Sequence, residues 1–357
     1  MYSSLSLTQF RSYHDAYFEL SPNVTIVVGP NGSGKTNLLE AVYVLSQGSS
    51  FRVADKDLIA AHETWFRIEG QFGDQRRILT YDMERQPAKQ FSLDGVKKQR
   101  LTYPQRVPLV LFEPDELRLL QGSPQRRRDY IDGCLSRLWP DAGTIRGRFE
   151  RTLLQRNNII KHAHTRPLSS LEDELFVWDI KLAEYAAALV NLRLQLVKLW
   201  NNHVSDTYSR LAGRQSHVII TYRSDVDTSV YKTSFLQRLH HNRQQDVARG
   251  FTTVGPHRDD ISIELDGQEA ALSASRGEVR SLVLSLKLTE LALLEAQHDR
   301  PPLLLLDDVF SELDTSRRLA LANLAMTRQT IITTTDIDSI AVHFPDSYGI
   351  IETHQLR

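Results

Sequence analysis

The sequence is short of cysteine, of long apolar runs and of net charge. Its 357 residues include one cysteine, Cys134, so an internal disulfide framework is excluded and a role in core packing is expected for the thiol. No apolar run approaches the roughly 20 residues that a membrane-spanning helix needs, and no signal peptide is expected at the N-terminus. The formal net charge is −1, so a surface for an acidic polymer would have to be local. We expect a soluble cytoplasmic protein.

The most specific motif is the octapeptide at residues 29–36, which matches the phosphate-binding pattern Gly-x-x-x-x-Gly-Lys-Ser/Thr at every fixed position. A β-branched run at 24–28 predicts a strand before it, and residues 37–45 predict a helix after it. Glycines let backbone amides surround a phosphate, and the helix N-terminus adds positive charge. This context disfavours the alternative, a Gly-rich turn without a ligand. The residues predicted to bind ATP are Gly29, Pro30, Asn31, Gly32, Ser33, Gly34, Lys35 and Thr36.

A pair of aspartates ends an apolar run far along the chain. Residues 303–306 are four leucines, as expected for a strand buried on both faces of a sheet. Carboxylates at the end of such a strand supply the oxygen ligands that Mg²⁺ prefers beside phosphates. We therefore predict that Asp307 holds Mg²⁺ together with Thr36, and that Asp308 orients or deprotonates the attacking water. The alternative is a pair of capping aspartates, which the phosphate-binding loop disfavours.

A third motif, at residues 274–278, opens a predicted helix. A serine and a glycine at a helix start make a second anion site, and one chain does not need two such sites for one γ-phosphate. We predict that Ser275 and Gly277 of one protomer act on the γ-phosphate bound by its partner, as catalytic residues alongside Lys35 and the acidic pair. The same residues also fit a capping box with Glu278, and both interpretations can hold together.

The three motifs, in this order, resemble the ABC-type ATPase heads, including those of SMC proteins. Residues 311–314 resemble the D-loop of that class, which implies that Asp314 contributes to nucleotide binding and bridges two sites. Further stretches are similar to the RecF family of bacterial recombination proteins, and they follow in order along nearly the whole chain. They are residues 7–13, 36–41, 50–52, 112–117, 122–128, 253–260 and 306–314.

The resemblance implies an α/β fold, an ABC/SMC-head-like phosphate-loop ATPase lobe with an inserted, mainly helical lobe. About 270 residues separate Thr36 from Asp307, so the ATPase lobe must be built from both ends of the chain. We expect this lobe over residues 1–108 and 251–357, and the helical lobe over 109–250. The leucine periodicity at 171–199 predicts a helix, but the segment is far too short for an SMC arm, so no long coiled coil is expected.

The RecF resemblance also implies a function. ATP would close two heads into a dimeric clamp on single-stranded, duplex or gapped DNA, and hydrolysis would release it. A weak, DNA-stimulated ATPase with ATP and Mg²⁺ as cofactors is implied, acting in DNA replication, recombination, repair and the SOS response by supporting RecA loading with RecO and RecR. Arg276 stands where the family usually has Gln. Thr335 stands where most ABC heads have a sensor histidine, so we expect slow turnover.

Two basic clusters are candidates for DNA contact. The first is Lys97, Lys98 and Arg100 together with Arg106, and the second is the run Arg126, Arg127 and Arg128. Charge runs are usually solvated faces, and the resemblance makes the DNA interpretation about equal to that one. Such contacts would be to phosphates, independent of base sequence and weakened by salt. Alternatively, the second cluster pairs with acidic groups between the lobes. Arg52 fits nucleotide contact and bracing of its own loop equally well.

Three other functions fit less well. A transporter nucleotide-binding subunit would predict a sensor histidine and more closely spaced motifs. A scaffold that uses ATP only as a dimer switch would not need the acidic pair. A nuclease would need a further acidic or histidine cluster with metal-ligand spacing, which the sequence lacks.

Overall fold

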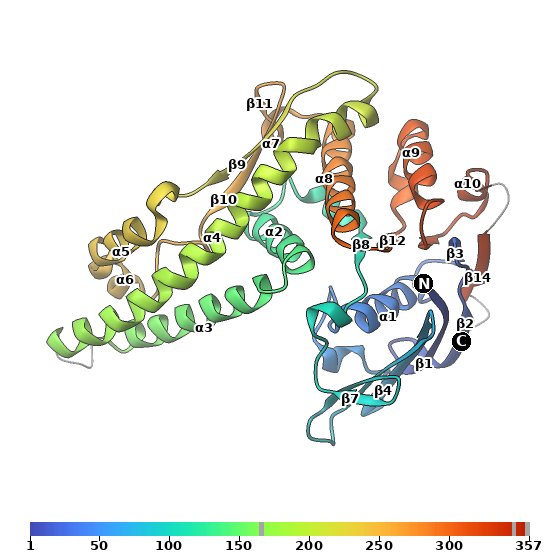
Figure 1. Cartoon of the computed structure of the whole chain (residues 1–357), viewed down its shortest axis with the longest axis horizontal. Coiled ribbons are helices and arrows are strands. Elements are labelled where there is room, and N and C mark those ends of the chain that lie inside the picture. Colours follow the sequence, from blue (N-terminus) through green and yellow to red (C-terminus); the bar gives the residue numbers. More distant parts are fainter. Residues whose placement is uncertain (164–167, 345–347, 354–357) are drawn as a thin grey trace. The chain divides into compact units, whose positions relative to one another are not determined.

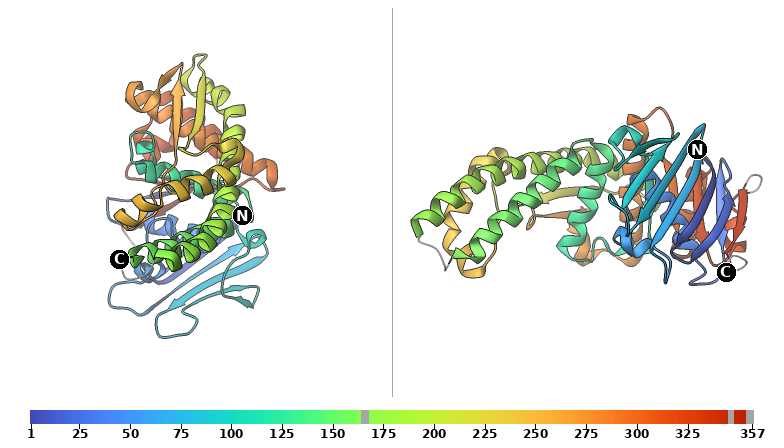
Figure 2. Two further views of the ribbon diagram at one scale, coloured as in Figure 1. Left: turned by 90° about the vertical axis from the view of Figure 1, so that its left-hand side faces the viewer. Right: turned by 90° about the horizontal axis from the view of Figure 1, so that it is seen from below.

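A computed structural model describes residues 1–163, 168–344 and 348–353 of the chain. The chain forms two compact units. Unit 1 contains Met1–Glu116 and Leu291–Arg357, and unit 2 contains Leu117–Glu290. Segments from the beginning and the end of the sequence, blue and red in Figures 1 and 2, therefore share unit 1.

Unit 1 contains a five-stranded parallel sheet in the order β14-β3-β13-β12-β8. Strands β12 and β13 are buried at every residue, which explains the four leucines of β12, whereas β13 combines two isoleucines with three buried threonines. Parallel strands need long crossovers, and here the largest crossover carries the whole of unit 2. The strands are β3 (Val24–Val28), β8 (Leu109–Phe112), β12 (Leu303–Asp307), β13 (Thr330–Thr334) and β14 (Tyr348–Glu352).

A six-stranded antiparallel sheet, in the order β2-β1-β4-β5-β6-β7, forms the other layer of unit 1 (Figure 2, right). Its strands alternate buried and exposed residues, as expected for a sheet with one face on a core. Asp94 and Gly95 both have left-handed backbone conformations in the β6–β7 hairpin. The strands are β1 (Tyr2–Phe10), β2 (Tyr13–Glu19), β4 (Trp65–Phe72), β5 (Gln75–Asp82), β6 (Lys89–Leu93) and β7 (Val96–Lys98).

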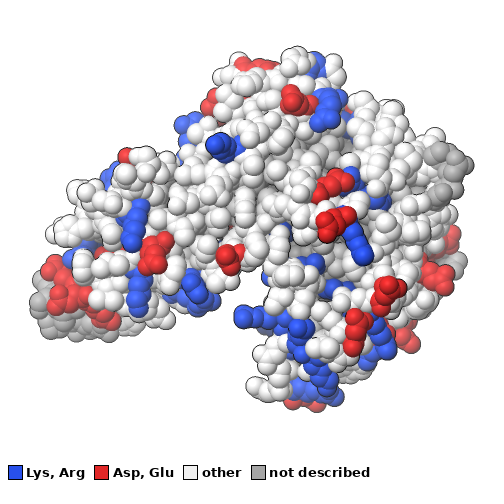
Figure 3. Space-filling view, in the orientation of Figure 1, with Lys and Arg blue, Asp and Glu red and all other residues white. Residues whose placement is uncertain are grey.

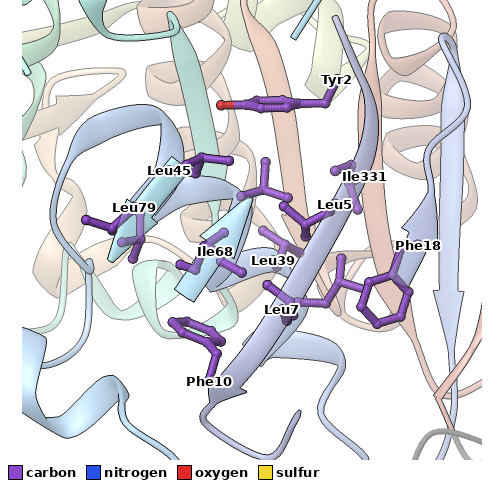
Figure 4. Packing of buried hydrophobic residues seen from close by; sticks show 14 of the residues in the cluster. Tyr2, Leu5, Leu7, Phe10, Phe18, Leu39, Leu45, Ile68, Leu79 and Ile331 are labelled. Carbon is purple, nitrogen blue, oxygen red and sulfur yellow. The ribbon is translucent and has the colours of Figure 1, made fainter. Parts of the chain in front are cut away.

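Helix α1 (Lys35–Gln47) packs against strands of both sheets and forms the centre of the unit 1 core. Its Leu39 and Leu45 lie among Leu5 of β1, Ile68 of β4 and Ile331 of β13 (Figure 4). All five of these side chains are buried. The helix start is therefore held by apolar packing on two sides, which fixes the loop that precedes it. The remaining helical elements of unit 1 are η1 (Asp55–Leu58), η2 (Tyr103–Gln105), η6 (Val309–Glu312), α9 (Thr315–Ala325) and α10 (Asp338–Ala341), and η3 (Pro114–Arg118) crosses its boundary with unit 2.

Unit 2 is mainly helical and is built on the long helix α4, which packs against α3 and α5 and against strand β9. Strands β9, β10 and β11 form a small antiparallel sheet. Helix α8 (Arg276–Gln297) begins in unit 2 and ends in unit 1. The other elements are α2 (Pro124–Leu138), α3 (Ala142–Lys161), α4 (Leu168–Ala212), β9 (Val218–Arg223), η5 (Thr228–Val230), α5 (Tyr231–His241), α6 (Arg243–Arg249), β10 (Asp260–Leu265), β11 (Gln268–Glu269) and α7 (Ala270–Ser273).

The unit boundaries differ from the ranges expected from the sequence. Residues 109–116 belong to unit 1 because β8 is an edge strand of the parallel sheet. Residues 251–290 group with unit 2, because β10 pairs with β9 of the helical insertion over six residue pairs. Both boundaries are set by strand pairing between segments far apart in sequence, and not by a change in the hydrophobic pattern along the sequence. Within the described residues, no helix combines the length and apolarity needed to cross a membrane.

Candidate nucleotide site

The phosphate-binding loop joins the C-terminal end of β3 to α1, as the sequence predicted. Gly32 and Gly34 have φ angles of +78° and +105°, which strain any other L-residue. A Cβ on Gly34 would also lie 2.8 Å from the Ser12 Oγ. The Tyr13 hydroxyl donates a 3.0 Å hydrogen bond to the Gly34 carbonyl, so β2 holds the loop from outside. Backbone conformation thus requires glycine at both positions, and limited space requires it at Gly34 as well.

Lys35 is the first residue of α1 and is largely buried. Its Nζ donates hydrogen bonds to the carbonyl oxygens of Gly29, at 2.8 Å, and Pro30, at 2.9 Å. Burial lowers the pKa of Lys35, and the nearby carboxylates of Asp308 and Asp307 oppose that shift. The ammonium group is therefore fixed inside the loop, where it adds to the positive end of the helix.

The two predicted halves of the site meet through Thr36 and Asp307. The Thr36 Oγ1 donates to the two carboxylate oxygens of Asp307 at 2.9 and 3.1 Å. The Thr333 Oγ1, on the neighbouring strand β13, donates to Asp307 Oδ1 at 2.7 Å. A hydroxyl and a carboxylate oxygen are a donor set that fits Mg²⁺, which takes few protein ligands beside phosphate oxygens and water. Residues 271 positions apart in sequence thus form one contact.

Asp308 has a strained and partly unsatisfied environment. Its φ is +50°, in the left-handed region. Its N–H donates to the Thr333 Oγ1 at 2.9 Å, and its carbonyl accepts from the Ser311 Oγ at 2.7 Å. The Oδ1 is buried without a hydrogen-bond partner. Burial is the largest cause of a raised pKa of Asp308, while Lys35 opposes the shift. A carboxylate oxygen with an unused acceptor site can take a hydrogen bond from water.

Thr333 is the site residue that the sequence analysis missed. It accepts from the backbone of Asp308 while it donates to Asp307, so one hydroxyl fixes both aspartates. The available signal was the run of threonines that ends an otherwise apolar strand. Thr335, the residue at the position of a sensor histidine, follows β13 and is exposed.

Hydrogen bonds to Glu40 link the loop after α1 to this helix. Glu40 of α1 is fully buried and accepts two hydrogen bonds from the Arg11 guanidinium, at 2.8 and 3.1 Å. The Ser50 Oγ also donates to Glu40, and it accepts from the Arg52 backbone N–H at 2.9 Å. The backbone of Arg52 therefore takes part in these hydrogen bonds, whereas its exposed side chain keeps the role of a predicted nucleotide contact.

The signature residues lie in unit 2, at the start of α8. The Ser275 N–H and Oγ–H both donate to Glu278 Oε2, at 2.9 and 2.8 Å, and the Glu278 N–H donates to the Ser275 Oγ at 3.3 Å. This reciprocal pattern is a capping box. The hydrogen bond from the Ser275 backbone is the largest cause of the lowered pKa of Glu278. Ser275 and Arg276 are exposed, and Gly277 is half-buried. The phosphate contact predicted for Ser275 and Gly277 stays a prediction.

Arg214 extends the capping box, since its Nη2 donates to Glu278 Oε1 at 2.8 Å. Asp314, in unit 1, also caps a helix: its carboxylate accepts from the N–H of Arg317 at 3.0 Å and the Oγ of Ser316 at 2.9 Å. The Arg317 hydrogen bond is the largest cause of its lowered pKa. Both motifs are ordered by local hydrogen bonds while remaining partly exposed.

The two basic clusters have different surroundings. Arg127 forms a bidentate pair with Asp260, at 2.8 and 2.6 Å, and Arg128 donates to the Asp259 carbonyl at 2.8 Å. These partners lie in unit 2, as the arginines do. Arg126 is half-buried. In the first cluster, Lys97 and Lys98 lie on the edge strand β7, and Arg100 lies just after it. Figure 3 shows Lys and Arg gathered in this part of unit 1.

The family described as the RecF/RecN/SMC N terminal domain matches residues 1–355. The chain is 33% identical over 356 residues to the DNA replication and repair protein RecF of Heliobacterium modesticaldum, which covers 97% of this chain and 94% of that protein. It is 34% identical over 353 residues to the RecF of Streptococcus pneumoniae (strain P1031), which covers 97% and 95%.

Solved structures give the same result. A structure of the recombination mediator protein RecF with ATP, in the RecFOR pathway, superposes with a TM-score of 0.84 at 28% identity, covering 94% of this chain and 92% of that one. A Smc head bound to the C-terminal winged-helix domain of ScpA shares the fold, with a TM-score of 0.52 at 16% identity, covering 96% of this chain and 91% of that one. The phosphate loop, the acidic pair and these similarities together show that the chain belongs to the RecF family of SMC-type ATPase heads.

Proposed function

We propose that this protein is an ATP-gated DNA clamp of recombinational repair, in which ATP joins two heads around DNA and hydrolysis separates them. One observation carries the proposal: Thr36 and Asp307 are in hydrogen-bond contact, with Asp308 adjacent to them on the same strand end. The family membership of the chain supports nucleotide binding, and so does the structure of a relative with ATP.

The mechanism follows from the positions of the side chains. Lys35 and the amides of the loop bind the β- and γ-phosphates. Mg²⁺, held between Thr36 and Asp307, would neutralise charge that develops on the phosphate oxygens. Asp308 uses its unpaired oxygen to orient a water molecule toward the γ-phosphorus and accepts a proton from it. Catalysis is then positioning and electrostatics, because phosphoryl transfer needs little covalent assistance from the protein.

The γ-phosphate also has to link two protomers. The exposed Ser275 hydroxyl and the amide of Gly277, at the start of α8, complete the site of a partner molecule. Asp314 lies on the D-loop and connects the two sites. The homodimer holds DNA through phosphate contacts, for which the cluster at Lys97 and Lys98 is the candidate surface. RecO and RecR are the proposed partners in loading RecA, because a relative acts in the RecFOR pathway.

The test is sedimentation of the Asp308→Asn protein with a labelled gapped duplex, with and without ATP and Mg²⁺. This variant keeps the phosphate and Mg²⁺ ligands and loses the group that activates water. We expect an ATP-dependent dimer that carries the DNA. Lys35→Met is the negative arm and should neither dimerise with ATP nor retain DNA, because the γ-phosphate loses its cation.

Lys56→Met is the matched control, since Lys56 is an exposed lysine of unit 1 outside the site. It should behave as the unmodified protein. If the Asp308→Asn protein stays monomeric with ATP and binds DNA equally well either way, ATP does not gate the clamp. A Lys35→Met protein that still dimerises with ATP would remove the switch from the mechanism.

A further inference from the structure

A cavity of about 820 Å³ lies within unit 1, at the amino-terminal ends of the parallel strands, whereas the nucleotide site lies at their carboxyl ends. Leu303, Pro108 and Gln329 line it, and these residues begin or precede β12, β8 and β13. Thr36 and Asp307 meet instead at the carboxyl ends of the strands. Phe72 and Arg77, from the β4–β5 hairpin, line the other side. The volume falls within the range of about 300–1,000 Å³ of ligand-binding pockets, and nothing in the mechanism above uses it.

The cavity is lined by cations that lack carboxylate partners. Arg77 is only 2% exposed, and its guanidinium donates to the neutral oxygens of Gln75, at 2.9 Å, and Gln105, at 2.8 Å. Its Nε has no hydrogen-bond partner, and no carboxylate among the described residues pairs with it. The Nε of Arg106 is likewise buried and unpaired. A buried guanidinium without an anion is costly, so an anionic ligand would be stabilising here.

The mouth of the cavity adds to this charge. Arg300 is exposed there, and the one carboxylate among the described lining residues, that of Asp299, is exposed beside it. The lining therefore carries three arginines against one aspartate. This surplus favours a ligand with more than one negative charge.

The apolar lining includes an aliphatic wall beside the aromatic residues Phe72 and Tyr103. The wall consists of Pro104, Val107, Pro108, Pro301 and Leu303. The aromatic rings at the cavity are already paired: Tyr103 stacks on His298 with centroids 6.3 Å apart, and Phe72 packs on Tyr2 at 4.9 Å. Among the described lining residues, both aromatic rings therefore already have a ring neighbour, which leaves less ring surface for stacking on a nucleobase. An aliphatic side chain of a peptide suits these walls better.

We propose that this cavity is a docking site for a peptide segment of a partner protein, in which an aliphatic side chain is flanked by carboxylates. The aliphatic group fills the space between the prolines and Leu303. One carboxylate meets the exposed Arg300 at the mouth, and another meets the half-buried Arg106 beside the buried charge of Arg77. The site lies across the sheet from the nucleotide, so a partner could be held without covering the phosphate loop.

The test uses the full-length protein as the target for a random peptide display library, with counter-selection on the Arg106→Glu variant. A representative selected peptide is then synthesised with a fluorescent label, and binding is measured by anisotropy. We expect the selected peptides to place Asp or Glu beside Leu, Ile or Val. Arg106→Glu and Arg300→Glu should each weaken binding about tenfold, because a lining cation becomes an anion. Since Arg300 is exposed, its variant does not depend on refolding of the interior.

Arg85→Glu is the matched control, because Arg85 is an exposed arginine of the same unit outside the cavity. It should leave peptide binding unchanged, and all three variants should bind a fluorescent ATP analogue as the unmodified protein does. Selection of no peptides, or of basic or uncharged ones, would overturn the proposal. So would equal binding by Arg300→Glu, or displacement of the peptide by a single-stranded oligonucleotide in a manner that requires Arg106, which would assign the cavity to nucleic acid.

Discussion

The phosphate loop and the signature are both helix starts, yet their surroundings are opposite. Lys35, at the start of α1, is 7% exposed and lies next to carboxylates of β12. Ser275 and Arg276, at the start of α8, are exposed, and the hydroxyl of Ser275 is held by a glutamate three residues away. The first site draws its cation, hydroxyl and acidic groups from one unit. The second site is exposed at Ser275 and Arg276, which is the arrangement that we expect of residues proposed to act on a partner.

The largest expected effect comes from complementation between two inactive variants. Lys35→Met removes the phosphate cation, and Ser275→Arg blocks the signature, so each should lose ATP hydrolysis by more than about 100-fold. If Ser275 acts on a partner, an equimolar mixture contains heterodimers with one intact composite site. Hydrolysis should return to at most about half of the unmodified rate, since neither variant dimerises with itself and one of the two sites of each mixed dimer works.

The measurement is steady-state phosphate release across mixing ratios, with a maximum expected at the equimolar point. Each variant mixed with Lys56→Met protein provides the reference for dimer formation. A mixture that stays as inactive as its components would mean that loop and signature serve the same chain, and the comparison would fail.

A smaller effect is expected inside the complete site, from Thr333→Val. The isosteric change removes the donor to Asp307 and the acceptor for the Asp308 N–H. We expect about a tenfold loss of kcat, because each lost hydrogen bond in a buried site costs about 1–3 kcal/mol. Thr330→Val is the matched control, at the other end of β13, where the hydroxyl bonds the Ala325 carbonyl. Both variants should unfold at lower temperature, but only Thr333→Val should slow hydrolysis of bound ATP.

The smallest expected effect is on the melting temperature of the protein without nucleotide. The raised pKa of Asp308 means that folding disfavours its ionised form, so this carboxylate destabilises the protein above the ordinary aspartate pKa. Asp308→Asn should therefore raise the melting temperature at pH 7, and the gain should shrink as pH falls through the ordinary aspartate range. Thermal unfolding at several pH values measures this. An equal gain at every pH would point to packing rather than charge, and Ser311→Ala controls for loss of the neighbouring hydrogen bond.

What the sequence could predict was local. The phosphate loop, the strand that ends at Asp307, the capping box at Ser275 and the hairpin at Asp94 each depend on residues a few positions apart. The contact of Thr36 with Asp307 could be predicted only because both motifs are expected to hold Mg²⁺ beside the same phosphates. The role of Thr333 could not be predicted, because a hydroxyl at a strand end becomes functional only through the strand beside it.

The unit boundaries failed to follow from the pattern for the same reason. Residues around Asp260 look like a return to alternating strands and helices, but their hydrogen bonds go to β9, and Arg127 pairs with Asp260 itself. The contacts that place residues 251–290 in unit 2 join segments that are far apart in sequence. Periodicity along the chain does not contain this information.

Strand β3 lies between β13 and β14, and this order constrains how the molecule is made. The ribosome releases β3 early, but both of its neighbours emerge about 300 residues later, which at about 5–20 residues per second takes roughly 15–60 s. For most of that interval β3 lacks both of its neighbours in the parallel sheet, and Asp307 has not yet been synthesised. The residues of unit 2 are synthesised in between and can fold first. A nascent chain therefore cannot join Thr36 to Asp307 and Thr333 until β12 and β13 have been synthesised.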